Sequence, residues 1–382
     1  MSPFFCFILG LQLTLGLKKT SQLEEAALLQ FMGLKKVPSP RIVQPVPFIL
    51  RKIFQERQKA AAAGQYQKLC YVKEFGVPGN LIRLFQDQGD LFYSKEVDQA
   101  PPCTQKFLFF NLSVITQDEQ LMMAQLHLKL GLNAYNNLQK DLELIVSLVR
   151  GPNRQSDQNL LLRYLPWPQG VLHVDLLDVV NKWNSNPQSN LGLMIELLPK
   201  GNSDSTGIIR PQDNCDNWRK SIQASLMMVT LTPKECPRFP HFPHFLHFSH
   251  FAHFPHFPHF PYFHRKRRDT LPTPEPTSEH LCRRHQLVIS FKELGWQQWI
   301  IAPKEFRTNY CKGDCPLSLM SFFNSSNYAF LQTLMNSRTP EIPKATCIPT
   351  KLSPLSMLYY DGDGNIILRH HKSMVVDECG CG

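Results

Sequence analysis

The sequence lacks a hydrophobic run long enough to cross a membrane. No stretch of its 382 residues reaches the roughly 18 unbroken apolar residues that a spanning helix requires. The apolar segment Pro3–Gly16 is too short for that role, and its composition is typical of the core of a secretory signal peptide. No Lys or Arg precedes this core, so a buried helix is the alternative interpretation. We predict a signal peptide over residues 1–18 and a secreted, extracellular protein.

Signatures of catalysis are also missing from the chain. No Ser/His/Asp set, pair of neighbouring carboxylates or phosphate-binding loop stands out among its motifs. The formal net charge is +10, but residues 269–382 are neutral, with 11 Lys and Arg against 11 Asp and Glu. A neutral segment does not suit binding to a phosphate backbone. We therefore predict no enzyme activity, no catalytic residues, no cofactor and no nucleic-acid partner.

The N-terminal half combines helical and strand-like patterns. Apolar residues at 23, 27, 31 and 34 mark one face of a helix, and four prolines between residues 38 and 47 favour an extended strap. Residues 48–64 return to a helical pattern. Apolar runs of strand length follow at 106–116, 121–132, 142–150 and 191–198, while 171–186 suit a helix or a mixed segment. This order predicts helices followed by a β-sandwich arm, with a glycosylation sequon at Asn111 in a strand-like run.

A histidine-rich repeat separates this half from the C-terminal segment. The unit His-Phe-x occurs seven times between residues 241 and 261, with a period of three that matches the polyproline II helix. Successive histidines would stand about 9 Å apart along the helix axis, whereas the ligands of one metal ion lie about 2 Å from it. A rigid rod cannot gather them, so we predict a linker without a metal site. Adventitious Zn²⁺ or Cu²⁺ binding by a flexible form is the alternative.

Four basic residues follow the repeat, namely Arg265, Lys266, Arg267 and Arg268. The spacing Arg-x-Arg-Arg is read by proprotein convertases, which hold several cationic side chains in acidic subsites. A proline-rich linker that cannot fold would keep this site extended and accessible. A basic surface run is the alternative, but the secretory signal and the cysteine-rich segment beyond favour cleavage after Arg268.

Cysteine is concentrated at the C-terminal end of the chain. Six of the eleven cysteines lie within the last 101 residues, at positions 282, 311, 315, 347, 379 and 381. An even number of cysteines in a short secreted segment predicts a disulfide framework. Structural zinc is a poor alternative, because a single residue between Cys379 and Cys381 is too few for the usual ligand spacing. Six cysteines allow fifteen pairings, and their spacing alone does not choose among them.

Four motifs resemble the mature domain of the transforming growth factor beta superfamily. They are LGWQQWIIAP from residue 294, NYCKGDCP from 309, CIPTKLSPLSMLYYD from 347 and NIILRHHKSMVVDECGCG from 365. The resemblance covers residues 282–382, and the N-terminal helices and arm resemble the family's propeptide more weakly. NSSNYAFLQTLM and ATCIPTKLSP look most like the Vg-one branch of embryonic growth and differentiation factors. The oocyte factors related to bone morphogenetic protein 15 are the alternative branch.

The resemblance implies a cystine knot. Bonds Cys311–Cys379 and Cys315–Cys381 would close an eight-residue ring with Gly313 at its middle, and Cys282–Cys347 would pass through it. Most members of the family carry a subunit-linking cysteine where this chain has Thr346. Because all six cysteines would be used inside the knot, we expect a non-covalent dimer.

The predicted fold class is therefore mostly β. A propeptide with N-terminal helices and a β-sandwich arm precedes a cystine-knot growth-factor domain, which has two antiparallel finger hairpins and one helix. The predicted domains are a signal peptide (1–18), the propeptide (19–237), the His-Phe-Pro linker with the convertase site (238–268) and the mature growth factor (269–382).

Within the mature segment, sequence patterns place the individual elements. Residues 287–291 and 299–303 are predicted strands of the first finger, and residues 353–376 form a second hairpin that turns at 361–364. Residues 325–337 form the helix, with Ser326 as its N-cap. Its apolar stripe, which we expect to be buried against a second subunit, consists of Phe330, Leu331, Leu334 and Met335. A second sequon begins at Asn324.

The resemblance also implies receptor contacts and a biological role. Trp296 and Trp299 would line a concave wrist that binds type I receptors, although packing against the fingers is the alternative. The exposed convex knuckle for type II receptors would contain Ala302, Ser356 and Leu358. The implied partners are type I and type II receptor serine/threonine kinases, an EGF-CFC co-receptor, a proprotein convertase, and a second copy or a nodal-type ligand in the dimer.

The function that follows is activin- or nodal-like SMAD signalling in mesoderm and axis patterning. A non-signalling antagonist of related ligands or receptors is an alternative from a different class. A secreted metal-binding protein built on the His-Phe repeat is a third hypothesis, which predicts that deleting residues 241–261 abolishes activity.

Overall fold

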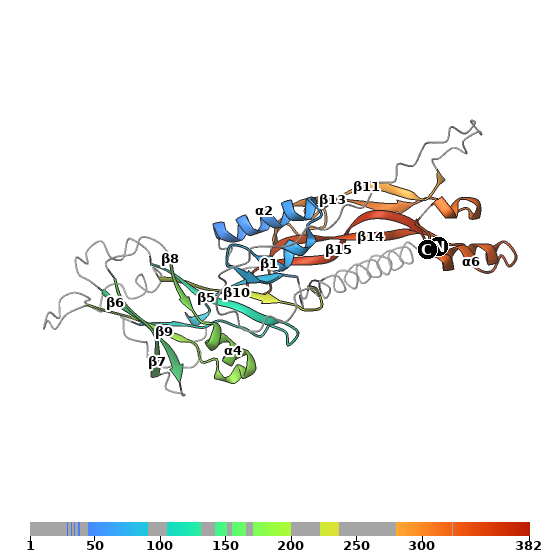
Figure 1. Cartoon of the computed structure of the whole chain (residues 1–382). Helices are drawn as coiled ribbons and strands as arrows, with labels where there is room; N and C mark the ends of the chain where they lie inside the picture. The colour runs from blue at the N-terminus through green and yellow to red at the C-terminus, as the bar shows by residue number, and fades with distance from the viewer. Residues whose placement is uncertain are drawn as a thin grey trace, which may run out of the picture. The chain divides into compact units, whose positions relative to one another are not determined.

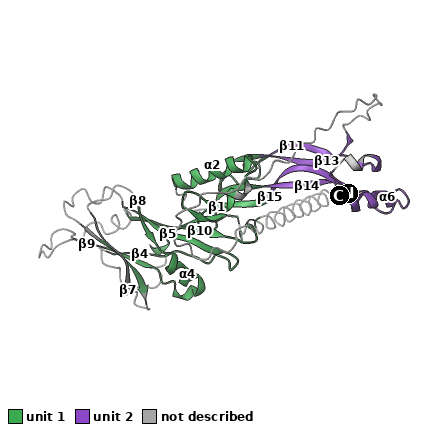
Figure 2. Cartoon of the chain, viewed as in Figure 1, with its two compact units in different colours: residues 1–236, 289–306, 354–372 green, residues 237–288, 307–353, 373–382 purple. Residues whose placement is uncertain are grey.

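The computed structural model describes residues 45–90, 105–130, 142–150, 155–165, 171–199, 222–236, 280–322 and 324–382, with 29, 32, 34, 37 and 38 in addition. The predicted signal peptide, most of the first helix and strap, the His-Phe repeat and the basic cleavage motif lie outside these residues. The chain divides into two compact units, shown in Figure 2. Unit 1 comprises residues 1–236, 289–306 and 354–372, and unit 2 comprises 237–288, 307–353 and 373–382.

Unit 1 is built on two antiparallel sheets (Figure 1). The seven-stranded sheet has the order β12 (Ile300–Ala302), β14 (Cys347–Tyr360), β15 (Ile366–Cys381), β3 (Leu81–Gln86), β10 (Ile222–Leu231), β5 (Gln120–Leu130) and β8 (Val171–Asp175). The four-stranded sheet has the order β4 (Gln105–Leu108), β9 (Leu193–Pro199), β6 (Leu142–Arg150) and β7 (Gln155–Leu165). A small ribbon pairs β1 (Tyr71–Val72) with β2 (Val77–Pro78).

One hydrophobic core lies between these two sheets, which confirms the predicted β-sandwich arm. Phe85, Leu126 and Leu226 enter it from the seven-stranded sheet, and Leu144 and Ile195 enter it from the four-stranded sheet. Each of these five side chains is fully buried. The alternation of apolar and polar residues along the strands explains why one face of each sheet is available for this packing.

The apolar runs predict most strands of the arm but not all of their limits. The runs at 121–132, 142–150 and 191–198 form β5, β6 and β9, and the mixed segment forms β8 followed by α4 (Leu177–Ser185). The run at 106–116 is strand only as far as Leu108. Asn111 therefore lies in a loop and not in a strand, and its Oδ1 accepts a hydrogen bond from the Ser113 amide at 3.1 Å. The strand ends where the Phe109 amide donates to Oδ1 of Asp87 at 3.1 Å, because this side-chain oxygen takes the place of a ladder partner.

The predicted second helix is α2 (Phe48–Ala62), which begins directly after Pro47. It buries Leu50, Ile53, Phe54 and the cationic side chain of Arg57. Short connections then lead through the 3₁₀ helix η1 (Tyr66–Cys70) to β3. Strand β3 pairs on one side with β10 and on the other with β15, so that the C-terminal segment contributes strands to a sheet of the N-terminal segment.

In its described residues the C-terminal segment has the two predicted hairpins, the predicted α-helix and a 3₁₀ helix, η5 (Leu317–Phe322). In the first finger, β11 (Arg283–Ser290) pairs with β13 (Glu305–Lys312). Residues 287–291 and 299–303 are predicted strands of the first finger, but β12, which lies in the second of these segments, pairs with β14 of the second finger. The intervening residues form turns around Phe291, Trp296 and Phe306, whose rings pack together. The Phe291 amide then bonds to the Lys304 carbonyl at 3.1 Å, so residue 304 and not Ala302 lies beside the first strand.

The second finger consists of β14 and β15 and turns where the sequence predicts it. Oδ1 of Asp361 accepts hydrogen bonds from the backbone amides of Asp363 and Asn365, each at 2.9 Å. Gly364 has a φ of 82°, a left-handed conformation that favours glycine. The helix α6 (Asn327–Asn336) begins at Ser326, whose Oγ accepts a bond from the Ala329 amide at 3.0 Å. Ser326 is thus the N-cap, as predicted. None of the helices in the described ranges is both long and apolar enough to cross a bilayer.

Candidate functional site

Three disulfides organise unit 2. The structure joins Cys311 to Cys379, Cys315 to Cys381 and Cys282 to Cys347, with Cα–Cα distances of 5.7, 5.9 and 5.3 Å. These are the three pairs that the family resemblance implies. The Sγ atoms of Cys282, Cys315 and Cys381 lie within 4.8 Å of one another, so the third bond passes close to the ring.

Gly313 gives the ring room for this crossing. It has a φ of 128°, and a Cβ at this position would collide with the backbone carbonyl of Leu281. The amide of Cys282 also bonds to the Asp314 carbonyl at 2.9 Å. The segment before Cys282 therefore lies directly against the glycine, and no larger residue fits there without a shift.

The disulfides replace an ordinary core in this unit. Its buried cluster consists of Met320, Ala329, Ala345 and half-cystines at 282, 315 and 381. Few other apolar side chains in the described part of the unit are covered. Small domains with so little buried area depend on cross-links for their stability.

Thr346 lies at the surface of unit 2, beside the C-terminal residue. Its amide and carbonyl exchange hydrogen bonds with Gly382, each at 2.9 Å. The threonine occupies the position where the family resemblance predicts a subunit-linking cysteine. Its hydroxyl cannot form a covalent bridge.

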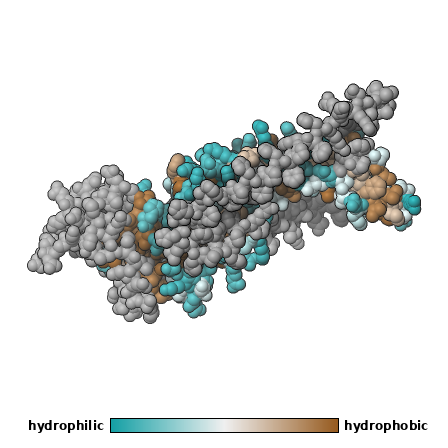
Figure 3. All heavy atoms as spheres, in the orientation of Figure 1, coloured by the Kyte–Doolittle hydropathy of each residue, from teal (hydrophilic) through white to brown (hydrophobic). Residues whose placement is uncertain are grey.

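The predicted stripe of α6 is exposed. Phe330, Leu331 and Met335 are 43%, 58% and 45% accessible, and Leu334 is half-buried. Hydrophobic side chains gather over this helix in Figure 3. Tyr328, at 73%, extends the apolar surface on the same helix. Within its own unit the helix buries Ala329 and Thr333, so the stripe is available to another surface.

The predicted receptor residues are mostly buried in this precursor. Ser356 and Leu358 are 2% and 1% accessible, and Ala302 is half-buried. The strand face that the resemblance implies to be exposed in the mature domain is therefore covered in the full chain. The physical reason is that N-terminal residues pack on the second finger within unit 1.

The two tryptophans belong to an aromatic cluster. Trp296 and Trp299 are 8% and 1% accessible, and their rings lie 5.5 Å apart. Trp299 also meets the edge of Tyr359 at 6.1 Å. Burial raises the pKa of Tyr359 to about 12, and its hydroxyl donates to the carbonyl of Met32 in the N-terminal segment. The geometry is that of the packing alternative, in which the tryptophans support the fingers.

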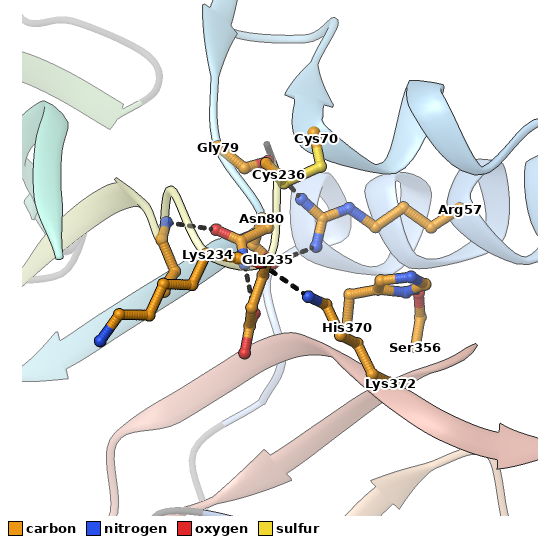
Figure 4. The surroundings of a disulfide bond; sticks show 11 residues. Arg57, Cys70, Gly79, Asn80, Lys234, Glu235, Cys236, Ser356, His370 and Lys372 are labelled. Atoms are coloured by element: carbon orange, nitrogen blue, oxygen red, sulfur yellow. Dashed lines mark hydrogen bonds between the residues drawn. A yellow bond between two sulfur atoms is a disulfide. The ribbon is translucent and has the colours of Figure 1, made fainter. Parts of the chain in front are cut away.

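A polar contact, here called the clamp, holds the second finger against the N-terminal segment (Figure 4). The clamp consists of Arg57, Asn80, Glu235, Arg369 and Lys372. Oε1 of Glu235 accepts a hydrogen bond from Nη2 of Arg369 at 3.1 Å, and the other oxygen accepts one from Asn80. Nζ of Lys372 donates to the backbone carbonyl next to Glu235, at residue 234, over 2.9 Å.

The backbone around the clamp is tied down at several points. The guanidinium of Arg57 donates to the carbonyls of Gly79 and Asn80 at 3.1 and 3.0 Å. A disulfide joins Cys70 to Cys236, the residue after Glu235. The sequence does not indicate this bond, because the five cysteines before residue 282 show no diagnostic spacing. The clamp cannot be predicted from the sequence either, because Glu235 and Arg369 are 134 residues apart in the chain.

Strand pairing adds to the clamp. Residues 366–369 of β15 align with residues 84–81 of β3 in antiparallel register. The amide of Gln86 bonds to Oδ1 of Asn365 at 3.0 Å at the end of this ladder. Addition of a strand to a sheet edge supplies main-chain hydrogen bonds, and side chains then decide which strand fits.

Two neutral histidines lie in the same contact. His370 and His371 are 8% and 3% accessible, and Nδ1 of His370 is 3.2 Å from Oγ of Ser356. Burial lowers the pKa of His370 to about 4, and the nearby cations Arg57 and Lys372 act in the same direction. Burial, Arg369 and His370 lower the pKa of His371 to about 3. Both are therefore uncharged near neutral pH.

The two sequons differ in their surroundings. Asn111 is half-buried, and its Nδ2 donates to Oδ2 of Asp363 in the turn of the second finger at 3.2 Å. Asn324 is exposed, and its Nδ2 donates to Glu378 at 2.8 Å. Arg265, Lys266, Arg267 and Arg268 lie outside the described residues.

Comparison with known proteins gives matches over nearly the whole chain. A family model for the transforming growth factor beta like domain matches residues 281–381, and one for the TGF-beta propeptide matches residues 16–217. Growth/differentiation factor 3 of Mus musculus is 46% identical, over 97% of each chain. Derriere protein of Xenopus tropicalis is 36% identical over 100% of this chain and 99% of its own. Protein DVR-1 of Xenopus laevis is 34% identical over 94% and 93%.

Proposed function

The chain belongs to the transforming growth factor beta family, and we propose that it is the precursor of a secreted, dimeric ligand that signals after its propeptide is cut away. Members of this family are growth factors and not enzymes, and they generally form dimers and bind type I and type II receptors. The proposal adds the step that exposes the receptor-binding residues, the nature of the dimer and the receptor class.

The burial of Ser356 and Leu358 carries the proposal. In the precursor both residues lie in unit 1 together with residues 1–236, and Ser356 contacts His370, which lies near Arg57 of α2. A receptor cannot contact side chains that are 1–2% accessible. Their use as a type II receptor surface therefore requires the propeptide to move away. The motif Arg265–Arg268 lies between the propeptide and the knot, at the place where a convertase cut separates the two.

Dimerisation follows from the exposed stripe of α6. Phe330, Leu331 and Met335 present apolar surface that burial against a second copy would stabilise. Thr346 leaves the interface without a covalent bond, so partners can exchange. A homodimer and a heterodimer with a nodal-type ligand both satisfy these conditions.

The likeness to DVR-1 and Derriere protein supports an activin- or nodal-like branch of the family. We accordingly assign activin-type receptors, an EGF-CFC co-receptor and SMAD signalling in mesoderm and axis patterning. No described contact favours the oocyte-factor branch.

The test compares receptor-reporter activity of wild-type precursor with that of a variant lacking Arg265 and Arg268. Conditioned medium is assayed before and after convertase treatment, on cells with and without an EGF-CFC co-receptor. We expect reporter activity only from cleaved wild-type protein, because the uncleaved form keeps its knuckle covered. The matched control replaces Lys35 and Lys36, a basic pair outside the motif, and should remain active.

Two outcomes would overturn the proposal. Equal activity of the uncleavable variant would show that separation is not needed. Inhibition of a related ligand without any reporter activation would identify an antagonist.

A further inference from the structure

Two histidines that are distant in sequence face each other on neighbouring strands of the arm. His127 of β5 and His173 of β8 are directly paired in the antiparallel register. Their ring centroids lie 4.3 Å apart, with the planes at 82°. Directly opposed residues of such a ladder place their Cβ atoms about 5 Å apart. Two imidazoles at that separation can direct one nitrogen each toward a single ion.

One ring nitrogen of His127 is available to a ligand. Its Nε2 is buried and has no hydrogen-bond partner among the described residues. A buried polar atom without a partner costs roughly 1–3 kcal/mol, which is why such atoms are uncommon.

A third ligand lies near the two histidines, and the nearby positive charge is exposed to solvent. Asp175 lies two residues beyond His173 on the same face of β8 and pairs with Gln125. Its carboxylate is therefore a diagonal neighbour of His127. Oδ1 of Asp175 accepts a hydrogen bond from the Leu177 amide at 3.0 Å, so Oδ2 is the oxygen that would approach an ion. Among the residues of β5 and β8 that the structure pairs, Lys129 is the one cation on this face, and it is exposed, so its ammonium can extend into water. His173 is also exposed and can rotate toward Nε2 of His127 without moving the backbone.

We propose that His127 and His173, with Asp175, form a binding site for a divalent transition metal, for which Zn²⁺ is the probe. Two imidazoles, one carboxylate and a water make a tetrahedral set that suits zinc. Strand β8 is the last strand of the seven-stranded sheet, and β5 is its neighbour there. A bound ion would cross-link this edge to the body of the arm. None of its three residues belongs to the predicted receptor-binding residues or to the His-Phe repeat.

The repeat determines how the site must be tested, because its seven histidines are additional imidazoles in the same chain. The method must report each histidine individually. Secreted full-length precursor is titrated with Zn²⁺ and modified with diethyl pyrocarbonate, and each site is quantified by mass spectrometry. We expect zinc to reduce labelling of His173 by about tenfold in the wild type, because its nitrogen becomes a ligand.

Substitution separates a two-histidine site from binding to one ring. His127→Gln should abolish the protection of His173. The matched control is His285→Gln, because His285 stacks on Tyr310 at 5.2 Å and has no histidine opposite it; this variant should retain the protection. Secretion and the four disulfides of the described residues show whether each variant folds.

A second measurement does not require any change at the half-buried position. The exposed His173 is replaced by Gln, and deuterium exchange at the C2 proton of His127 is followed with and without Zn²⁺. Zinc should slow this exchange in the wild type and have no effect in the variant. Protection of His173 that persists in His127→Gln would overturn the proposal. So would unchanged labelling of His173 at zinc concentrations that already protect the repeat histidines.

Discussion

The carboxylate of Glu235 in the propeptide accepts a hydrogen bond from the guanidinium of Arg369 in the second finger at 3.1 Å. Both side chains are largely shielded from solvent, with 20% and 24% of their surface accessible. The disulfide at Cys236 holds the next residue of the loop to Cys70. The Cys70–Cys236 disulfide of the propeptide thus positions the Glu235 carboxylate against Arg369 of the growth factor. This contact should persist after cleavage at Arg265–Arg268.

Neutralising Glu235 should weaken the hold of the propeptide on the cleaved growth factor. Glu235→Gln keeps the shape of the side chain but removes the charge opposite Arg369. A charge-assisted hydrogen bond of this kind contributes about 2 kcal/mol, or roughly 30-fold in Kd. Surface plasmon resonance between the purified propeptide and the mature dimer measures the change.

The matched control for this substitution is an ion pair on the surface of the same loop. Lys234 and Asp118 lie 2.8 Å apart but are 80% and 63% accessible. Exposed pairs contribute little because water screens them. Asp118→Asn should leave the Kd unchanged, and an equal loss in both variants would contradict a specific role for Glu235.

Acidification should loosen the precursor between about pH 6.5 and pH 4. The pKa of His370 is lowered to about 4, so the unfolded chain binds a proton in this range more readily than the folded one. The stabilisation is fully present above pH 6.5 and is lost as the pH falls, by at most about 3 kcal/mol for this residue. The groups that face His370 are Arg57, Lys372 and Ser356, and the two cations disfavour its protonation.

Thermal unfolding of the precursor over this pH range tests the effect. The difference between wild type and His370→Gln isolates one histidine, because the carboxylates titrate in both proteins. The variant should lose less stability on acidification than the wild type. Parallel curves would contradict the assignment.

The sequence predicts much of the fold because several signals are local. The apolar runs of β5, β6 and β9 have strand length, and Ser326 stands where an N-cap is needed. The cysteine positions match the family motif residue by residue. In each case the decisive information lies within a few residues of the element.

The remainder depends on contacts between distant residues. Strand β7 has a polar first half, so its hydrophobic pattern does not predict a strand. It is a strand because it pairs with β6. Ser356 has no sequence feature that indicates burial, because the segment covering it is encoded elsewhere in the chain. His127 and His173 meet only through strand register. Such relationships appear when the sheet is assembled and not before.

Adding a methyl group to Gly313 should prevent correct closure of the knot. In Gly313→Ala the new Cβ would collide with the carbonyl of Leu281, at a φ of 128° that alanine rarely adopts. We expect little secreted protein, with mispaired half-cystines by peptide mapping under non-reducing conditions. The free-energy loss should exceed about 4 kcal/mol, since both backbone strain and a backbone clash are involved.

Gly295 provides the matched control for this position. Its φ is 77°, but a Cβ there would meet no atom within 4 Å. Gly295→Ala should therefore cost only the strain of the left-handed conformation, about 1–2 kcal/mol, and retain the three native pairs. Native pairing at full yield in Gly313→Ala would show that the crossing is looser than the structure indicates.

The surface of α6 should determine whether the mature growth factor dimerises. Leu331 is 58% accessible in the precursor, and Leu331→Glu places a charge in the middle of the apolar stripe. In a two-fold interface each substitution acts twice, so loss of the buried leucine alone should raise the dimer Kd at least about 100-fold. Sedimentation of the convertase-treated protein should then show a monomer.

A substitution at Thr346 tests the same interface in the opposite direction, by adding a covalent bond between the subunits to their non-covalent contact. Wild-type mature protein should migrate as a monomer on a non-reducing gel, whereas Thr346→Cys should give a dimer that reduction removes. Thr350→Cys is the control, because Thr350 is also exposed and lies only four residues further along the chain. It should form little dimer if the subunits meet specifically at residue 346. A reducible dimer of the wild type would show that one of the six half-cystines is free to bridge subunits, which the three closed bonds of the knot do not allow.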